Sequence, residues 1–344
     1  MKSTSRTAAK STRLREVLQD ARTLLVVLQD FPDPDAIGAA CALKEIARVT
    51  SNTATSLACA GTVGRAENRA LVSYLGLNLL RMDAVDLSSF DRIALVDTQP
   101  GTGNNRLPDG VVPHIVIDHH PIRGLTRSAR FYDVRSRYGS TSTILYEHLE
   151  SAGIEPSIPL ATALLYGIRS DTSDLGREAT QADIDAFLAL YPRANKRKLG
   201  QIGMAVLPRQ YFSLLAAGLG NAVTYGKAVA SELGDVENPD MIGEVADLLL
   251  RNEESTWALC CGYHGGRLLI SVRTSEPKAD AGRVVKRVVG PRGTGGGHAA
   301  MAGGQIVLSD PSEEAAGSEA DAVVERFIKA LRLQGTPGQR LVTG

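Results

Sequence analysis

Acidic and imidazole side chains recur in the first half of the chain, each close to the end of a short apolar run or a helical stretch. The set consists of Asp33, Asp35, Asp97, Asp118, His119, His120 and Asp171. Carboxylates mixed with imidazoles, with no cysteine among them, suit Mn²⁺ or Mg²⁺ better than a structural zinc ion. Two such ions roughly 3.5–4 Å apart can bind a phosphoryl group and activate water. The residue types therefore indicate a two-metal site for phosphate chemistry.

Short strands are the elements that would bring these residues together. Apolar runs at 24–28, 93–96 and 115–117 are too short for helices, and helical stretches separate them. This alternation predicts an open, mainly parallel sheet flanked by helices. The carboxyl ends of parallel strands share one edge, where ligands bind. A further predicted helix at 157–166 leads to Asp171, which adds a fourth acidic segment to that edge.

A third predicted helix, at 140–151, follows the hydroxyl-rich stretch Gly139–Thr143. Such a stretch can bind a phosphate at the N-terminus of a helix, where backbone N–H groups have no partner within the helix. It can also cap the helix with its own hydroxyl oxygens, and capping is the simpler interpretation.

The second half has the pattern of a smaller, mixed α/β domain. Its predicted elements are strands at 257–263, 268–273 and 305–308 and helices at 281–289 and 313–333. Between them lies a glycine-rich segment with Gly295, Gly296, Gly297 and His298. Glycines let a phosphate approach backbone N–H groups closely, because no side chain intervenes. We therefore expect this segment to be a substrate-binding loop.

The length of 344 residues exceeds what one hydrophobic core usually supports. We expect a metal-binding domain at 21–192, a linker region at 193–210 and a C-terminal domain at 211–335. The polar ends of the chain, 1–20 and 336–344, are expected to be flexible tails.

Composition narrows the range of partners. The 38 basic side chains equal the 38 acidic ones, so no global positive field attracts long nucleic acid. The four cysteines lack metal-type spacing and are expected to be reduced thiols. No apolar run approaches the roughly 20 residues of a membrane span, and no secretory signal opens the chain. These features predict a cytoplasmic protein that does not bind a membrane.

Taken in order, these residues give the chain a resemblance to the DHH phosphoesterases and their associated substrate-binding domain. The motifs that carry it are Pro32-Asp33-Pro34-Asp35-Ala36, Val96-Asp97, Asp118-His119-His120, Gly167-Ile168-Arg169-Ser170-Asp171-Thr172 and the segment 295–303. The resemblance extends over residues 21–333. It is closest to the nanoRNase and pAp-phosphatase branch, which is related to the RecJ exonucleases but lacks their extra domains.

The resemblance implies a role for each matching residue. Asp33 and Asp97 would hold one metal, while Asp35, Asp97, His119 and Asp171 would hold the other. His120 would face the substrate phosphate, and Asp118 would orient the imidazoles. In the C-terminal domain, Arg273, the three glycines and His298 would hold the far end of the substrate. The expected metal is Mn²⁺, with Mg²⁺ as the alternative, and a homodimer is the expected assembly.

One position departs from the family pattern. Members usually carry a His four residues before the first motif Asp, and this chain has Gln29. A Gln carbonyl can coordinate Mn²⁺ or Mg²⁺, but it binds transition metals less strongly than imidazole. The first metal would then bind loosely, prefer Mg²⁺ or require substrate. The adjacent Asp30 could compensate only if its side chain pointed to the same side of the strand.

The resemblance and the balanced charge together predict a hydrolase that acts on a small nucleotide or short single-stranded oligonucleotide. A nanoRNA oligoribonuclease or pAp phosphatase is the leading hypothesis. Its alternatives are a cyclic-dinucleotide phosphodiesterase and a pyrophosphatase or exopolyphosphatase. A third hypothesis, raised by Gln29, is a nucleotide-binding regulatory protein with weakened catalysis.

Overall fold

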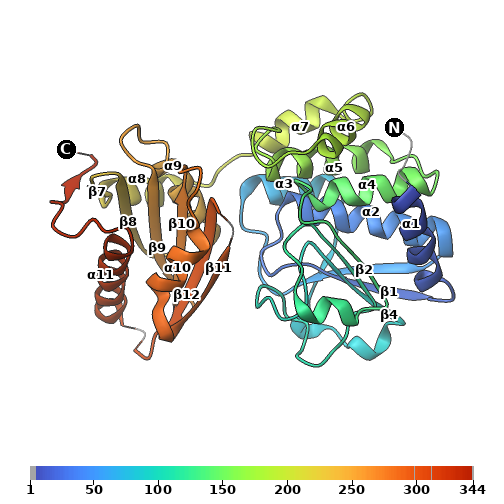
Figure 1. Ribbon diagram of the computed structural model, residues 1–344, viewed down its shortest axis with the longest axis horizontal. Helices are drawn as coiled ribbons and strands as arrows, with labels where there is room; N and C mark the ends of the chain where they lie inside the picture. Colours follow the sequence, from blue (N-terminus) through green and yellow to red (C-terminus); the bar gives the residue numbers. More distant parts are fainter. Residues whose placement is uncertain (1–4, 298, 311, 343–344) are drawn as a thin grey trace. The chain divides into compact units, whose positions relative to one another are not determined.

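The computed structural model describes residues 5–297, 299–310 and 312–342 (Figure 1). Contacts divide the chain into two compact units, one ending at Ala205 and one beginning at Val206. The division lies within the region expected to be a linker. Helix α7 (Lys196–Gly203), inside that region, buries Leu199 and Ile202 against the first unit. Most of the expected linker is therefore part of the N-terminal unit.

A six-stranded parallel sheet forms the centre of the described part of the first unit, with the order β3-β2-β1-β4-β5-β6. Its strands are β1 (Thr23–Val27), β2 (Ala54–Cys59), β3 (Leu79–Arg81), β4 (Arg92–Val96), β5 (Ile115–Asp118) and β6 (Phe131–Val134). The strand order reverses direction between β1 and β4. In doubly wound sheets, such a switch point opens a crevice at the carboxyl ends of the strands.

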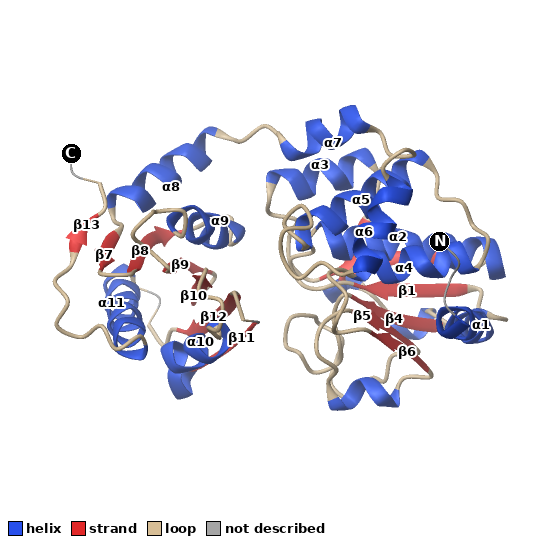
Figure 2. Ribbon diagram, turned by 45° about the horizontal axis from the view of Figure 1, so that its top comes forward, coloured by secondary structure: helices blue, strands red, loops and turns tan. Residues whose placement is uncertain are grey.

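The two faces of this sheet are covered differently. Helices pack on one face, as Figure 2 shows, where Leu24 and Val26 of β1 join the main core. These helices are α1 (Ser5–Leu18), α2 (Pro34–Ser51), α4 (Thr141–Ser151), α5 (Ile158–Asp171) and α6 (Gln181–Leu190), and α3 (Ala66–Tyr74) packs beside α2 and α7. Leu25 and Val27 alternate to the opposite face. Short 3₁₀ turns and loops cover that side.

The expectation of a flexible tail at 1–20 is wrong for the described residues, because a helix begins at Ser5. Leu14 and Leu18 lie one turn apart on the buried face of α1 and are at most 1% exposed. Thr7 and Ser11 lie on the same side of α1, donating to Glu147 at 2.8 Å and contacting His148 at 2.7 Å, respectively. The polar composition had obscured the apolar spacing of this helix.

The second unit is a seven-stranded mixed sheet among its described residues, with the order β11-β12-β10-β9-β8-β7-β13. Its strands are β7 (Val223–Tyr225), β8 (Ala228–Asp235), β9 (Trp257–His264), β10 (Arg267–Thr274), β11 (Gly293–Gly297), β12 (Met301–Val307) and β13 (Gln339–Arg340). Helices α10 (Ala281–Val289) and α11 (Glu313–Ala330) pack on one face, and α8 (Arg209–Gly220) and α9 (Asp240–Leu249) on the other.

Two expectations for this unit are corrected. The segment 336–344 is not a free tail throughout, since β13 pairs with β7 and Leu341 donates to the carbonyl of Ala222. The glycine-rich segment is not a loop from Gly293 to Gly297, because it forms β11 and pairs antiparallel with β12. His298 lies outside the described residues. None of the described helices is long and apolar enough to span a membrane.

Candidate metal centre

The first acidic pair is placed by the start of α2, immediately after the end of β1. Asp33 is the N-cap of α2, and its carboxylate accepts a hydrogen bond from the N–H of Ala36 at 2.9 Å. Pro34 occupies the first turn of the helix, where its missing N–H leaves no bond unmade. Asp35 then lies inside the first turn and is fully buried. The motif Asp-Pro-Asp thus directs two carboxylates into the switch-point crevice.

The N-terminus of α4 faces Asp35. The N–H groups of Thr141 and Ser142 donate to the two oxygens of Asp35 at 2.6 and 2.7 Å. Ser140 caps the same helix by accepting from the N–H of Thr143 at 3.1 Å. The hydroxyl-rich stretch therefore caps α4. The N–H groups of its first turn bind the Asp35 carboxylate and are not available to a phosphate.

Asp97 stands at the end of β4 in a strained backbone conformation. Its φ of 59° is left-handed, a region that Asp tolerates better than most residues but still at a cost in energy. Thr141 donates from its hydroxyl to Asp97 Oδ1 at 2.8 Å, and the residue is only 2% exposed. The backbone strain turns a buried carboxylate toward the crevice instead of continuing the strand.

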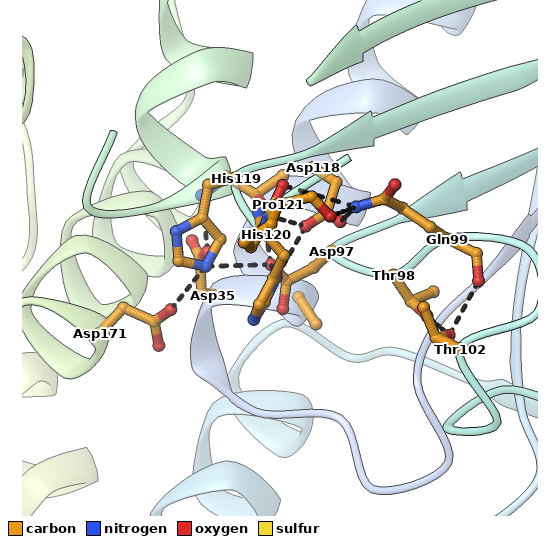
Figure 3. A network of polar contacts seen from close by, with 12 residues as sticks. Asp35, Asp97, Thr98, Gln99, Thr102, Asp118, His119, His120, Pro121 and Asp171 are labelled. Carbon is orange, nitrogen blue, oxygen red and sulfur yellow. Dashed lines mark hydrogen bonds and ion pairs between the residues drawn. The ribbon is translucent and has the colours of Figure 1, made fainter. Parts of the chain in front are cut away.

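His119 lies between three of these carboxylates (Figure 3). Its Nδ1 contacts the carbonyl oxygen of Tyr138 at 3.2 Å. A carbonyl only accepts, so Nδ1 carries the hydrogen and the neutral ring presents a lone pair at Nε2. Nε2 lies 3.2 Å from Asp171 Oδ2 and 3.6 Å from Asp97 Oδ1. Nε2 is buried, and these two carboxylates face it.

Two overlapping sets of ligand atoms meet here, each with all its atoms within 4.8 Å of one another. One set is Asp35, His119 and Asp171, and the other is Asp97, His119 and His120. Asp171 is the last residue of α5, and His119 and His120 follow β5. Residues from four separate elements therefore converge as the sequence predicted.

Electrostatics show that this cluster carries more negative charge than the protein neutralises. Burial raises the pKa of Asp35 to about 8, and the charge of Asp171 adds to that shift. Burial and Asp171 likewise raise the pKa of Asp33 to about 6. The pKa of Asp97 is raised well above its usual value by burial and by the charges of Asp33 and Asp35. Like charges this close cannot all remain ionised without a cation.

The same excess of negative charge changes the pKa of His119. Burial alone would lower its pKa, but the carboxylates of Asp171 and Asp97 hold it well above 6.5. A proton on Nε2 thus takes the place that a divalent cation would fill. Oxygen ligands with one imidazole lone pair suit Mn²⁺ and Mg²⁺, so the residues present fit the metal that the fold family implies.

His120 is held differently from its neighbour. Asp118 Oδ1 accepts hydrogen bonds from the His120 backbone N–H at 3.1 Å and from Nδ1 at 2.8 Å. Hydrogen bonds from His120, together with its charge, overcome the effect of burial and lower the pKa of Asp118. The side chain of His120 is 34% exposed. Because Nδ1 of His120 is turned toward Asp118, Nε2 lies on the side of the ring that points away from that carboxylate.

Gln29 lies just beyond the carboxyl end of β1, at the edge of the sheet that carries the acidic cluster. It follows β1 by two residues and is partly exposed, and its role as a metal ligand stays a prediction. Asp30 forms an ion pair with Arg106 at 3.2 Å, and its N–H donates to the carbonyl of Asn104. Asp30 is therefore committed to a neighbouring loop.

In the second unit, successive glycines of β11 lie on opposite faces of the strand. A Cβ on Gly293 would lie 2.6 Å from Val289 of α10, and one on Gly295 would lie 3.2 Å from Val285. A Cβ on Gly296 would meet nothing within 4 Å. Alternate glycines therefore let α10 approach the sheet, while Gly296 leaves the opposite face open. We expected all three glycines to serve substrate access, and packing accounts for Gly295.

Arg273 is the last residue but one of β10, which is separated from β11 by β12. Its Nε pairs with Asp247 of α9, and Nη1 donates to the hydroxyl of Ser271 at 2.7 Å. An anion would have to compete with Asp247 for that side of the guanidinium. Phosphate binding by Arg273 therefore stays a prediction.

Comparisons with known proteins agree with both units. A profile described as "DHH family, N-terminal domain" matches residues 24–168, and one described as "DHHA1 domain" matches residues 225–330. An exopolyphosphatase-related protein from Bacteroides fragilis has a similar fold, with a TM-score of 0.74, 16% identity and coverage of 94% of this chain and 98% of that one.

Two sequence relatives extend the comparison. The uncharacterized protein MJ1633 of Methanocaldococcus jannaschii is 34% identical over 288 residues, which is 83% of this chain but 58% of that protein. This chain thus spans less than two thirds of that relative. A "Probable manganese-dependent inorganic pyrophosphatase" of Streptococcus agalactiae is 25% identical over 245 residues, or 67% of this chain and 75% of that protein.

Proposed function

The chain belongs to the DHH family, and on that premise we propose that it is a divalent-metal-dependent phosphoesterase acting on small nucleotides or short oligonucleotides. One observation carries the proposal: the buried Nε2 of His119 lies 3.2 Å from Asp171 Oδ2 and 3.6 Å from Asp97 Oδ1, and ligand atoms of Asp35, His119 and Asp171 all lie within 4.8 Å of one another. A group of this charge and donor type would hold a cation.

The residues that would hold divalent cations are Asp35, His119 and Asp171 on one side and Asp33 with Asp97 on the other. When bound, the cations supply charge neutralisation on phosphoryl oxygens and activation of water. The N–H groups of α4 keep the Asp35 carboxylate oriented, and the Tyr138 carbonyl keeps Nε2 of His119 turned inward. These contacts prepare the ligand geometry before a cation arrives.

His120 would act on the substrate. Asp118 accepts the hydrogen on Nδ1, and in a protonated ring Nε2 carries a second hydrogen that it could donate to a phosphoryl oxygen. A protonated His120 could also deliver its proton to a leaving oxygen.

A nucleotide substrate is favoured over a long nucleic acid by the zero net charge. The second unit supports the same substrate class, since Gly296 leaves an open face on β11, where backbone groups can be approached closely. The purified chain with Mn²⁺ should release product from dinucleotides, pAp or cyclic dinucleotides. Failure on all three, with metal binding intact, would overturn the nucleotide proposal.

Inorganic pyrophosphate is the second candidate substrate, because a curated relative carries that activity in its name. The resemblance of the segment 295–303 to the substrate-binding domain of the nanoRNase and pAp-phosphatase branch favours nucleotides instead. Phosphate release from pyrophosphate and from pAp, measured with the same enzyme and metal concentrations, separates the two. We expect the higher kcat/KM for pAp, and a higher value for pyrophosphate would replace the first proposal by the second.

A further inference from the structure

Gln99 is a buried amide near the start of the loop between β4 and β5, and neither its type nor its position in the sequence indicates a role. It is 1% exposed. Figure 3 shows its side chain directed at the loop that carries the Asp118-His119-His120 triplet. Its Nε2 donates to Asp118 Oδ2 at 2.5 Å and to the carbonyl of Pro121 at 3.2 Å.

The other end of the same amide is also occupied. Oε1 accepts from the N–H of Arg123 and from the hydroxyl of Thr126, both at 2.7 Å. Reversing the amide would set its oxygen against a carboxylate and a carbonyl and its NH₂ against an N–H donor. The neighbours therefore fix which end is the donor.

The consequence for Asp118 is that its two oxygens have different partners. Oδ2 is held by Gln99, and Oδ1 accepts both hydrogens of His120, from the backbone N–H and from Nδ1. A carboxylate held at one oxygen cannot rotate away from the imidazole. Gln99 thus acts on His120 through Asp118.

We propose that Gln99 is a positioning residue that fixes the Nδ1–H tautomer and the orientation of His120 by anchoring the far oxygen of Asp118. The proposal rests on the proposed function only for its kinetic consequence, because the tautomer can be measured without any substrate. Interactions that orient a functional imidazole are commonly worth about 10–100-fold in activity.

The test uses the full chain with histidine labelled by ¹⁵N and ¹³C, in Mg²⁺ so that the spectra remain diamagnetic. Long-range ¹H–¹⁵N spectra report which ring nitrogen of His120 carries the hydrogen, and the His120→Asn variant assigns the signals. The neutral ring in the unmodified chain should show Nδ1–H. A predominant Nε2–H form would overturn the proposal at once.

Two substitutions isolate the donor. Gln99→Met removes the amide at similar size, while Gln99→Glu keeps an acceptor for Arg123 and Thr126 and, where its carboxyl is ionised, offers Asp118 no donor. Both should shift the neutral His120 toward the Nε2–H form. Turnover should fall about 10–100-fold, and Mn²⁺ affinity should be retained, because Gln99 does not contact Asp35, His119 or Asp171.

Thr126→Val is the matched control, since it removes one bond to Gln99 Oε1 and leaves the Asp118 contact intact. It should keep the native tautomer and nearly all activity. If Gln99→Met fails to fold, Gln99→Glu and the spectrum of the unmodified chain still decide the matter. A native His120 tautomer in Gln99→Met, or in Gln99→Glu at a pH where the new carboxyl is ionised, would contradict the proposal, and an inactive unmodified chain with the Nδ1–H form would count against the proposed function alone.

Discussion

Two buried polar clusters lie in the N-terminal unit, and they differ in charge balance. In the first, around β6 and α4, Asp133 contacts Arg135 and His148 and forms an ion pair with Lys10 of α1. Glu147 joins the same group through Arg135 at 2.5 Å. Two carboxylates therefore meet two permanent cations and an imidazole. Burial alone would raise the pKa of Asp133, but hydrogen bonds from His148 and Arg135 hold it far below its usual value.

The second cluster is the candidate metal centre, where the balance is reversed. The carboxylates of Asp33, Asp35, Asp97 and Asp171 lie with the two imidazoles of His119 and His120, and the pKa of Asp35 is raised to about 8 rather than lowered. Both clusters are buried and rich in hydrogen bonds. The comparison shows that burial of acidic residues does not itself indicate a functional site. Negative charge that the protein's own cations do not neutralise does indicate such a site, because it favours the binding of a cation.

The largest expected effect tests the balanced cluster. Asp133→Asn leaves Arg135 and Lys10 without their shared carboxylate in a buried place. We expect a loss of about 3–5 kcal/mol in the free energy of unfolding, measured by urea denaturation. Asp35→Asn is the matched control, and it should cost far less because it removes one of several like charges. Equal losses for the two variants would erase the distinction between the clusters.

A second prediction concerns activity instead of stability. Asp97→Asn keeps a residue type that tolerates the left-handed backbone, so the fold should survive. We expect kcat to fall about 10³-fold, since a ligand facing both groups of metal-holding residues is lost. Steady-state kinetics on a nucleotide substrate in Mn²⁺ measures this. A decrease of less than about tenfold would remove Asp97 from the centre of the account.

The pH dependence of stability provides a third test. Between about pH 4 and 8 the folded chain binds more protons at Asp33, Asp35 and Asp97 than the unfolded chain does, because their folded pKa values are raised. In EDTA the free energy of unfolding should therefore fall as the pH rises through this range. A divalent cation at about 100 times its dissociation constant should restore about 2.7 kcal/mol. At one fixed cation concentration the gain should be larger at pH 8 than at pH 5, because the cation displaces protons. Calorimetry that shows stability rising with pH in EDTA would contradict the charge excess.

The parts of this arrangement that sequence could predict follow from residue type and strand ends. Asp97 and the Asp118-His119-His120 triplet end apolar runs, so a parallel sheet was enough to bring them together. Tyr138 and Gln99 could not be found in this way. Tyr138 acts through its backbone carbonyl, which any residue has, and Gln99 acts through contacts with a segment about 20 positions away.

The errors have a related physical cause. Leu14 and Leu18 of α1 are two apolar residues in a polar and basic stretch, so their helical spacing was overlooked. Glycine-rich sequence favours loops in general, yet Gly293 and Gly295 lie in a strand because α10 packs against them. Local composition predicts what a segment can do alone, and tertiary packing overrode it in both places.

The glycine strand offers a fourth prediction with an internal control. Gly293→Ala would place a Cβ 2.6 Å from both Val289 and the carbonyl of Gln305, so we expect a loss of about 1–3 kcal/mol. Gly296→Ala meets open space and should leave the thermal unfolding temperature nearly unchanged. If Gly296→Ala also weakens nucleotide binding, the open face belongs to the substrate site. Equal destabilisation by both variants would refute the division by face.

The smallest expected effect concerns Gln29. Gln29→His supplies the imidazole that the family usually carries, and we expect an increase of about tenfold in Mn²⁺ affinity. Titration calorimetry at constant pH measures it. An unchanged affinity would mean that Gln29 already serves as a ligand or that the position does not face the metal.

The most direct test of the account is the binding of Mn²⁺ to the full chain, followed by loss of the free-ion signal in electron paramagnetic resonance. Saturable binding of about two ions is expected, with a strong loss in Asp35→Asn and none in Asp133→Asn. Equal binding in Asp35→Asn and the unmodified chain, or no binding at all, would show that the unmet charge around His119 has another purpose.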